Sequence, residues 1–262
     1  MVPNFIAKRT PLYQSFRGNG LEIGAFEHPA DLPEVCDVTY CDVIRTTEAL
    51  KLFPEVNKEE LHEVDVILDI DKCGLSFFED NSQDFVIINH VLEHLFDPVF
   101  AIRECFRVLK KGGSLVASVP DKRFTFDKNR TVTTDVEIFE RIKRIPKIPT
   151  PEDYEDLLRN VHPNLLNEPQ HIRQKALEDF LVRREHLNIW TDNSFKSFFD
   201  VVCRKFRLTF ILVEKVTSKD NKFEFFACWK KSTKLNFFFR MFLEALLSLV
   251  SIRNFSRRER KR

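Results

Sequence analysis

The chain has 262 residues, and its 41 Lys and Arg against 40 Asp and Glu give no indication of a nucleic-acid-binding surface. This length fits one main α/β domain with an insertion. The first residues lack the apolar core of a signal peptide, and the six cysteines show no CxxC pair and no zinc-ligand spacing. These features predict a cytoplasmic protein with reduced thiols.

The first predicted strands end in residues suited to binding a ligand. A strand over 21–24 (LEIG) enters the turn AFEHP, and a second strand over 38–41 ends at Asp42. The connection between them is too short for a long crossover helix, so we expect that helix to be abbreviated. A helix over 46–53 and a third strand over 64–70 follow.

The segment 84–121 has the most informative pattern. The apolar run FVII (85–88) is typical of a parallel strand buried on both faces, and it turns polar at Asn89 and His90. A helix is predicted from Pro98 to the basic residues before two glycines, followed by a strand over 115–119. Because parallel sheets bind ligands at the carboxyl ends of their strands, these polar residues should line a cleft.

The second half completes the predicted sheet. Residues 127–185 are charged and free of glycine, and we interpret them as a helical insertion over the strand ends that serves as a substrate lid. An amphipathic helix over 191–203 and two strands, 206–216 and 222–230, follow. The predicted fold is a Rossmann-like, doubly wound, mostly parallel seven-stranded sheet with an antiparallel last strand.

The end of the chain differs in character from this domain (1–231). Residues 232–262 combine an apolar helical pattern carrying a narrow polar stripe with the basic cluster RRERKR. The apolar span is marginal for crossing a membrane. We therefore expect an amphipathic helix in 235–262 that contacts the inner face of a membrane peripherally, or docks on the protein or a second subunit; the sequence leaves the oligomeric state open.

Spacing and glycine content indicate the cofactor. Asp42 lies about 20 residues after the glycine turn, where an acid can accept hydrogen bonds from ribose hydroxyls. The turn keeps a single glycine, Gly24, and Phe26 and Pro29 disfavour the close backbone approach that a pyrophosphate needs. This favours S-adenosylmethionine over NAD.

The motifs LEIGAFEHP, VTYCD, ILDIDKCGLSF, SQDFVIINHVLEHLFDP, RVLKKGGSLVASVPD and HLNIWTDNSF, in this order, resemble class I S-adenosylmethionine-dependent methyltransferases of the type 11 sort. The resemblance implies a cofactor site in which the residues at the strand ends have distinct roles. Glu22 and Gly24 would line the methionine part, Asp42 the ribose, Asp71 the adenine, and Asn89 and His90 the methionine end or the substrate. Phe26, where the family usually has a glycine, belongs to the same predicted cofactor site.

His90, Glu93 and His94 form the pattern HxxEH, which on a helix places all three side chains on one face. The open interpretations are a metal site, general base catalysis by His90 or His94, and simple packing. We predict no metal here, and His90, His94 and His186 are the catalytic candidates. His186 is included because its loop borders the same cleft in the resembling fold.

The predicted function is methyl transfer from S-adenosylmethionine to a small-molecule acceptor, with a glycan or sugar-related precursor as one option. The basic residues Lys122, Arg123 and Lys128 are candidates to receive an anionic substrate. The alternatives are a catalytically inactive cofactor-binding scaffold tethered to a membrane or partner, and an NAD-dependent oxidoreductase.

Overall fold

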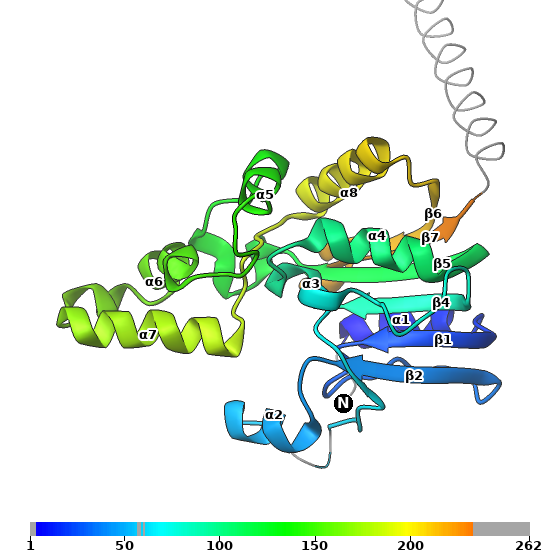
Figure 1. Cartoon of the computed structure of the whole chain (residues 1–262), viewed down its shortest axis with the longest axis horizontal. Helices are drawn as coiled ribbons and strands as arrows, with labels where there is room; N and C mark the ends of the chain where they lie inside the picture. Colours follow the sequence, from blue (N-terminus) through cyan, green and yellow to red (C-terminus); the bar gives the residue numbers. More distant parts are fainter. Residues whose placement is uncertain (1–3, 57–58, 60, 233–262) are drawn as a thin grey trace, which may run out of the picture.

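A seven-stranded sheet forms the centre of the protein (Figure 1), in the order β3-β2-β1-β4-β5-β7-β6. The computed structural model describes residues 4–56, 59 and 61–232. Six strands are parallel, and β7 runs antiparallel to both of its neighbours, which confirms the predicted sheet. The strands are β1 Gly18–Ile23, β2 Cys36–Asp42, β3 Val66–Ile67, β4 Gln83–Asn89, β5 Leu109–Pro120, β6 Phe210–Val216 and β7 Glu224–Lys231.

One face of the sheet is covered by three helices (Figure 1): α3 (Ile70–Cys73), α4 (Pro98–Val108) and α8 (Asp192–Phe206). Alternate residues of the central strands, such as Val86 and Ile88, pack against them in the main hydrophobic core. The residues predicted for the inward face of the late helix are all buried: Phe195, Phe198, Phe199 and Val202.

The opposite face is covered by α1 (Asn4–Tyr13), a helix that the sequence analysis did not predict. Its apolar residues follow no consistent helical face, and Pro11 lies inside it, so the pattern gave no signal. Leu12 and Tyr13 nevertheless bury against Phe85 and Ile87, the other alternate set on β4. The result is a sheet with helices on both faces.

Several predicted boundaries need correction. The third strand, predicted over 64–70, is reduced to Val66–Ile67, because the Asp69 carboxylate accepts a hydrogen bond from the Asp71 N–H (3.1 Å) and starts α3. The helix predicted to reach the glycines ends at Val108, and the extended backbone of β5 begins at the next residue. The expected turn at SKDN is instead the short helix α9 (Ser218–Asn221).

Other boundaries agree closely. The predicted helix over 46–53 is α2 (Thr46–Leu52), and residues 24–35, all of which are described, contain no helix, as expected for the abbreviated connection. Asp97 caps α4 by accepting from the Phe100 N–H (2.8 Å), with Pro98 in the first turn. The predicted amphipathic segment 235–262 lies outside the described residues.

Helices follow one another between β5 and α8 (Figure 1), beyond the carboxyl ends of the parallel strands. They bury a separate apolar cluster that includes Tyr154, Leu158 and Leu177 and contacts Phe96 at the sheet edge. The elements of this segment are η3 Lys122–Phe124, η4 Phe126–Asn129, α5 Asp135–Arg141, η5 Pro151–Tyr154, α6 Glu155–Val161, η6 Pro163–Asn167 and α7 Gln170–Arg183. Its position puts the end of α7 opposite the strand ends.

Candidate functional site

A cavity of about 680 Å³ lies at the carboxyl ends of β1, β2 and β4, within the range typical of small-molecule sites. Residues 182–185, at the end of α7, form part of its wall, as does Phe5 of α1. Seven of the predicted site residues line it: Glu22, Gly24, Phe26, Asp42, Asn89, His90 and His94. The two others, Asp71 and His186, are not part of its wall.

Glu22, at the end of β1, is 1% exposed. Both of its carboxylate oxygens lie 3.0 Å from the Ala30 N–H, which donates to them and ties down the turn after β1. Burial raises the pKa of Glu22 to about 7, although this N–H and the Arg9 guanidinium act in the opposite direction. Glu22 therefore changes its charge near neutral pH.

The glycine turn allows a close approach between β1 and the segment after β4. Gly24 has φ +69°, and a Cβ there would lie 2.5 Å from Cγ2 of Val91, so a side chain would be both strained and obstructed. Phe26 also has a positive φ (48°) and packs edge-on against Phe53 (centroids 5.5 Å apart) on the cavity wall. The turn thus places an aromatic side chain on the cavity wall.

Two polar side chains present acceptors to the cavity. Asp42 ends β2 and accepts a hydrogen bond from the Val43 N–H (2.6 Å); burial raises its pKa, while backbone N–H groups and Arg184 oppose this. Asn89 donates through Nδ2 to the Tyr13 hydroxyl (2.8 Å), and its buried Oδ1 has no hydrogen-bond partner in the described part of the chain. The Asp42 carboxylate can accept hydrogen bonds from ribose hydroxyls, and Asn89 Oδ1 can accept one from an ammonium group.

Asp71 does not line the cavity. Its two carboxylate oxygens accept hydrogen bonds from the N–H groups of Phe96 and Asp97, both at 2.8 Å. These bonds fix the segment that leads into α4. The geometry therefore gives Asp71 a role in holding that loop, and its predicted contact with adenine stays a prediction.

His90 lies between two buried carboxylates. Its Nε2 is 2.6 Å from Oε2 of Glu224, and its Nδ1 is 3.2 Å from Oε1 of Glu93. Burial alone would lower the pKa of His90, but the two carboxylates outweigh it and raise the pKa to about 9. The imidazolium form is therefore favoured at neutral pH, which argues against His90 as a general base.

The partner of His90 belongs to a buried ion pair that sequence reasoning missed. Arg9 of α1 donates through Nε to Oε1 of Glu224 on β7 (2.8 Å), and both side chains are almost fully buried. These residues stand 215 positions apart in the chain, and neither lies in a motif. No local signal could have revealed the pair.

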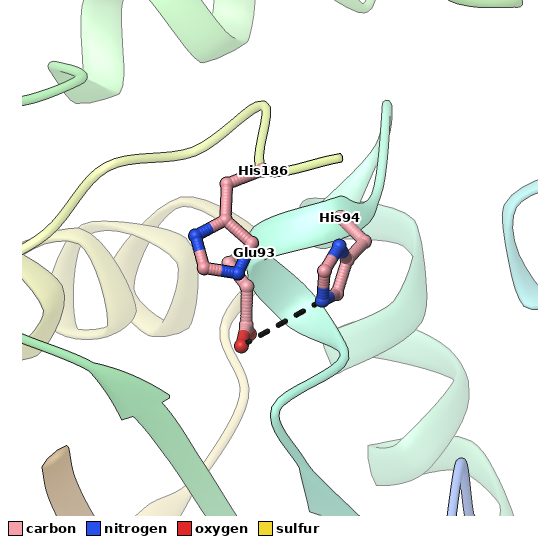
Figure 2. Close-up of side chains that lie close together, drawn as sticks. All are labelled: Glu93, His94 and His186. Carbon is pink, nitrogen blue, oxygen red and sulfur yellow. Dashed lines mark ion pairs between the residues drawn. The ribbon is translucent and has the colours of Figure 1, made fainter. Parts of the chain in front are cut away.

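Glu93, His94 and His186 come together (Figure 2), with one candidate ligand atom from each lying within 4.8 Å of the others. Of the three, His94 lines the cavity. Glu93 and His94 belong to the short 3-10 helix η2 (Leu92–His94), and His186 comes from the loop after α7. Burial and the neighbouring His186 lower the pKa of His94 to about 4, so its imidazole is neutral at pH 7.

The predicted basic patch does not lie on the cavity. Arg123 donates through Nε and Nη2 to the Asp121 carboxylate (2.9 and 2.5 Å), which neutralises its charge locally. Lys122 donates through Nζ to the backbone carbonyl of Lys128 (2.9 Å). Lys122 and Arg123 thus serve local contacts at the end of β5.

Comparison with known proteins agrees with this geometry. Residues 18–117 match the family described as "Methyltransferase domain". This range runs from the start of β1 through most of β5 and contains every predicted cofactor-binding residue. A probable S-adenosylmethionine-dependent methyltransferase from Mycolicibacterium smegmatis (strain ATCC 700084 / mc(2)155) is 45% identical over 51 residues, which are 20% of each protein. The chain thus matches about a fifth of the length of that curated relative.

Two solved structures are similar over most of the chain. One, from Rhodobacter sphaeroides and named as a Zn-dependent alcohol dehydrogenase, is 16% identical, with coverage of 86% of this chain and 90% of that chain and a TM-score of 0.52. At this identity the likeness shows the fold alone. The other is the N-methyltransferase NodS from Bradyrhizobium japonicum WM9, solved with S-adenosyl-L-homocysteine. It is 16% identical, with coverage of 88% of this chain and 86% of that chain and a TM-score of 0.43.

Residues 18–117, which include most of the parallel strands, match the methyltransferase-domain family, and this match agrees with the fold. The resemblance stated from the sequence motifs is confirmed. Within residues 4–56, 59 and 61–232, no helix has the length and apolarity needed to cross a membrane.

Proposed function

We propose that the protein transfers a methyl group from S-adenosylmethionine to a small-molecule acceptor. The observation that carries this proposal is the convergence of Glu22, Gly24, Asp42 and Asn89 on one cavity inside the matched domain. Asp42 would accept hydrogen bonds from the ribose, and Asn89 Oδ1 would accept from the methionine ammonium. Gly24 would let the cofactor approach the backbone.

The acceptor would enter on the side of the cavity formed by the insertion. Residues 183–185 are Arg, Arg and Glu, and this polar wall supports an acceptor with hydroxyl groups, including the sugar-related class. The insertion would then act as a substrate lid, as its sequence position suggested. His94 is the candidate to meet the acceptor, because it lines the cavity next to this wall.

The chemistry would be a direct displacement. An acceptor lone pair attacks the methyl carbon, the carbon–sulfur bond breaks with its electrons going to sulfur, and S-adenosyl-L-homocysteine leaves. If the acceptor is a hydroxyl, its proton passes to a base or to water. The protein's contribution would be mainly to hold the two reactants in line, since proximity and orientation can account for a large part of the barrier.

The test is calorimetric titration of S-adenosyl-L-homocysteine into the purified chain and the Asp42→Asn variant. Loss of a charged acceptor for the ribose should weaken binding by about 10- to 100-fold, from about 1.5–3 kcal/mol. Asp71→Asn is the matched control: it removes a strand-end carboxylate off the cavity, so affinity should stay within about two-fold while stability falls by about 1–3 kcal/mol. Equal effects of both variants, or no binding by the wild type, would contradict the proposal.

The same protein samples separate the rival functions. Incubation with methyl-labelled S-adenosylmethionine and a small-molecule extract should yield labelled product. Cofactor binding without any transfer would favour the inactive scaffold, and binding of NADH would favour the oxidoreductase. The peripheral membrane contact predicted for 235–262 stays a prediction, which flotation of the full chain against residues 1–231 on anionic liposomes would check.

A further inference from the structure

The side chains of Glu93, His94 and His186 converge (Figure 2), and they play no part in the cofactor contacts described above. His94 lines the cavity on the side proposed for the acceptor. Their candidate ligand atoms all lie within 4.8 Å of one another. From this geometry we infer that the three residues form a binding site for one divalent transition-metal ion, with zinc as the probe ion.

The Glu93 carboxylate is the strongest reason for the inference. Its side chain is 0% exposed, and neither oxygen has a hydrogen-bond partner in the described part of the chain. The nearest cationic group, the His90 imidazolium, forms an ion pair with Oε1 through Nδ1 at 3.2 Å. One ion pair on Oε1 leaves this buried carboxylate short of hydrogen bonds, which is costly, and a coordinated cation would supply the missing interactions.

In each histidine one ring nitrogen already makes a hydrogen bond, which is the usual arrangement in metal-ligating histidines. Nδ1 of His94 lies 2.6 Å from the Arg184 carbonyl oxygen, which can only accept, so Nδ1 carries the proton. Nδ1 of His186 lies 2.7 Å from Oδ2 of Asp127, and Arg130 in turn pairs with Asp127 (2.9 Å). The lone pairs of both histidines are therefore on Nε2, and outer hydrogen bonds fix both rings.

Two imidazoles and one carboxylate form a donor set that suits zinc and related first-row ions and leaves coordination positions open. In a tetrahedral zinc site, neighbouring ligand atoms stand roughly 3.3 Å apart. Nε2 of His94 is 4.0 Å from Oε1 of Glu93, so small side-chain rotations would close the site. The side chains of His94 and His186 are 32% and 12% exposed, so an open position would face the cavity and solvent.

The role of the ion rests on the proposed methyl transfer. A hydroxyl acceptor bound at an open position would have its pKa lowered by the cation and would release its proton to solvent. The resulting alkoxide would attack the methyl carbon as the carbon–sulfur bond breaks. His94 would then be a metal ligand instead of the general base that the sequence predicted. His186 would be a second ligand of the same ion.

This inference departs from the sequence prediction, which named no metal. The HxxEH pattern supplies only two ligands, Glu93 and His94, because in the structure His90 is held between Glu93 and Glu224. The additional ligand, His186, lies beyond the whole insertion and follows no ligand spacing. Only the folded loop after α7 brings it to η2.

The experiment is calorimetric titration of zinc into the full chain after dialysis against a chelator. We expect one ion per chain. His94→Ala and His186→Ala should each weaken zinc binding by more than about 100-fold, because even the loss of an outer hydrogen-bond partner costs 10- to 100-fold. His171→Ala, which removes an exposed histidine of α7, is the matched control and should bind like the wild type.

Cobalt substitution gives a second readout: a visible d–d absorption band that is present in the wild type and absent in His186→Ala. The partly exposed His186 makes this variant the decisive one, since Glu93→Gln alters a fully buried group and can fail to fold. Absence of one-to-one zinc binding, or equal affinity in the wild type and His186→Ala, would overturn the inference. Titrating S-adenosyl-L-homocysteine into the same metal-free samples tests the proposed function separately, because Asp42 and Asn89 do not belong to the metal site.

Discussion

Glu22 makes the stability of this protein depend on pH in an unusual direction. Its pKa is about 7 in the folded protein against an ordinary value of 4.5, chiefly because of burial. Below pH 4.5 the carboxyl is protonated in both the folded and the unfolded chain. Between pH 4.5 and 7 only the unfolded chain ionises, so folding loses about 3 kcal/mol, and the loss is complete above pH 7.

Glu22→Gln removes this titration and keeps an oxygen that can accept from the Ala30 N–H. The groups that act on Glu22, among them Arg9, Tyr13 and Tyr40, are present in both proteins, so their effects largely cancel in the comparison. The free energy of unfolding of the variant minus that of the wild type should therefore increase by about 2.5 kcal/mol from pH 5 to pH 8.

Urea unfolding at several pH values measures this difference, with the fluorescence of the buried Trp190 and Trp229 as the signal. Glu79→Gln, on the surface, is the control for removing a carboxylate charge. If the difference between Glu22→Gln and the wild type were the same at pH 5 and pH 8, the reasoning about the buried carboxyl would be wrong.

Two further predictions concern buried structure near the cavity. Arg9→Met should lower the free energy of unfolding in urea by about 3–5 kcal/mol, because Glu224 keeps a buried charge without its guanidinium partner. As a control, Arg159→Ala breaks an exposed pair with Glu155 and should lower it by at most about 1 kcal/mol. Equal costs would contradict this account of the ion pair. Gly24→Ala and Gly112→Ala both force a side chain onto a positive φ, and each should lower the free energy of unfolding by about 1–2 kcal/mol. Only Gly24→Ala, whose Cβ would meet Val91, should also weaken S-adenosyl-L-homocysteine binding. A Gly24→Ala variant with normal affinity would show that the turn does not contact the cofactor.

The sequence by itself determined the sheet and the position of its ligand-binding edge. The apolar run at 85–88 is typical of a buried parallel strand, and a crossover helix that starts at Pro98 requires the next strand to lie parallel to it. Since parallel strands end at the same edge, the polar residues after them had to lie together. Asp42 and Asn89 were placed at this edge in this way, and both line the cavity, because strand and helix periodicities are local properties of the chain.

Only the tertiary structure decided what the polar side chains contact at that edge. Asp71 has the sequence position of a cofactor ligand, yet its carboxylate turns toward the N–H groups of Phe96 and Asp97. His90 became a charged partner of Glu224 because β7, two strands away from β4 in the sheet, and α1 bring Glu224 and Arg9 together near the end of β4. His186 reached Glu93 and His94 because the insertion folds back over the strand ends. Such contacts depend on packing between distant segments, and no spacing along the chain encodes them.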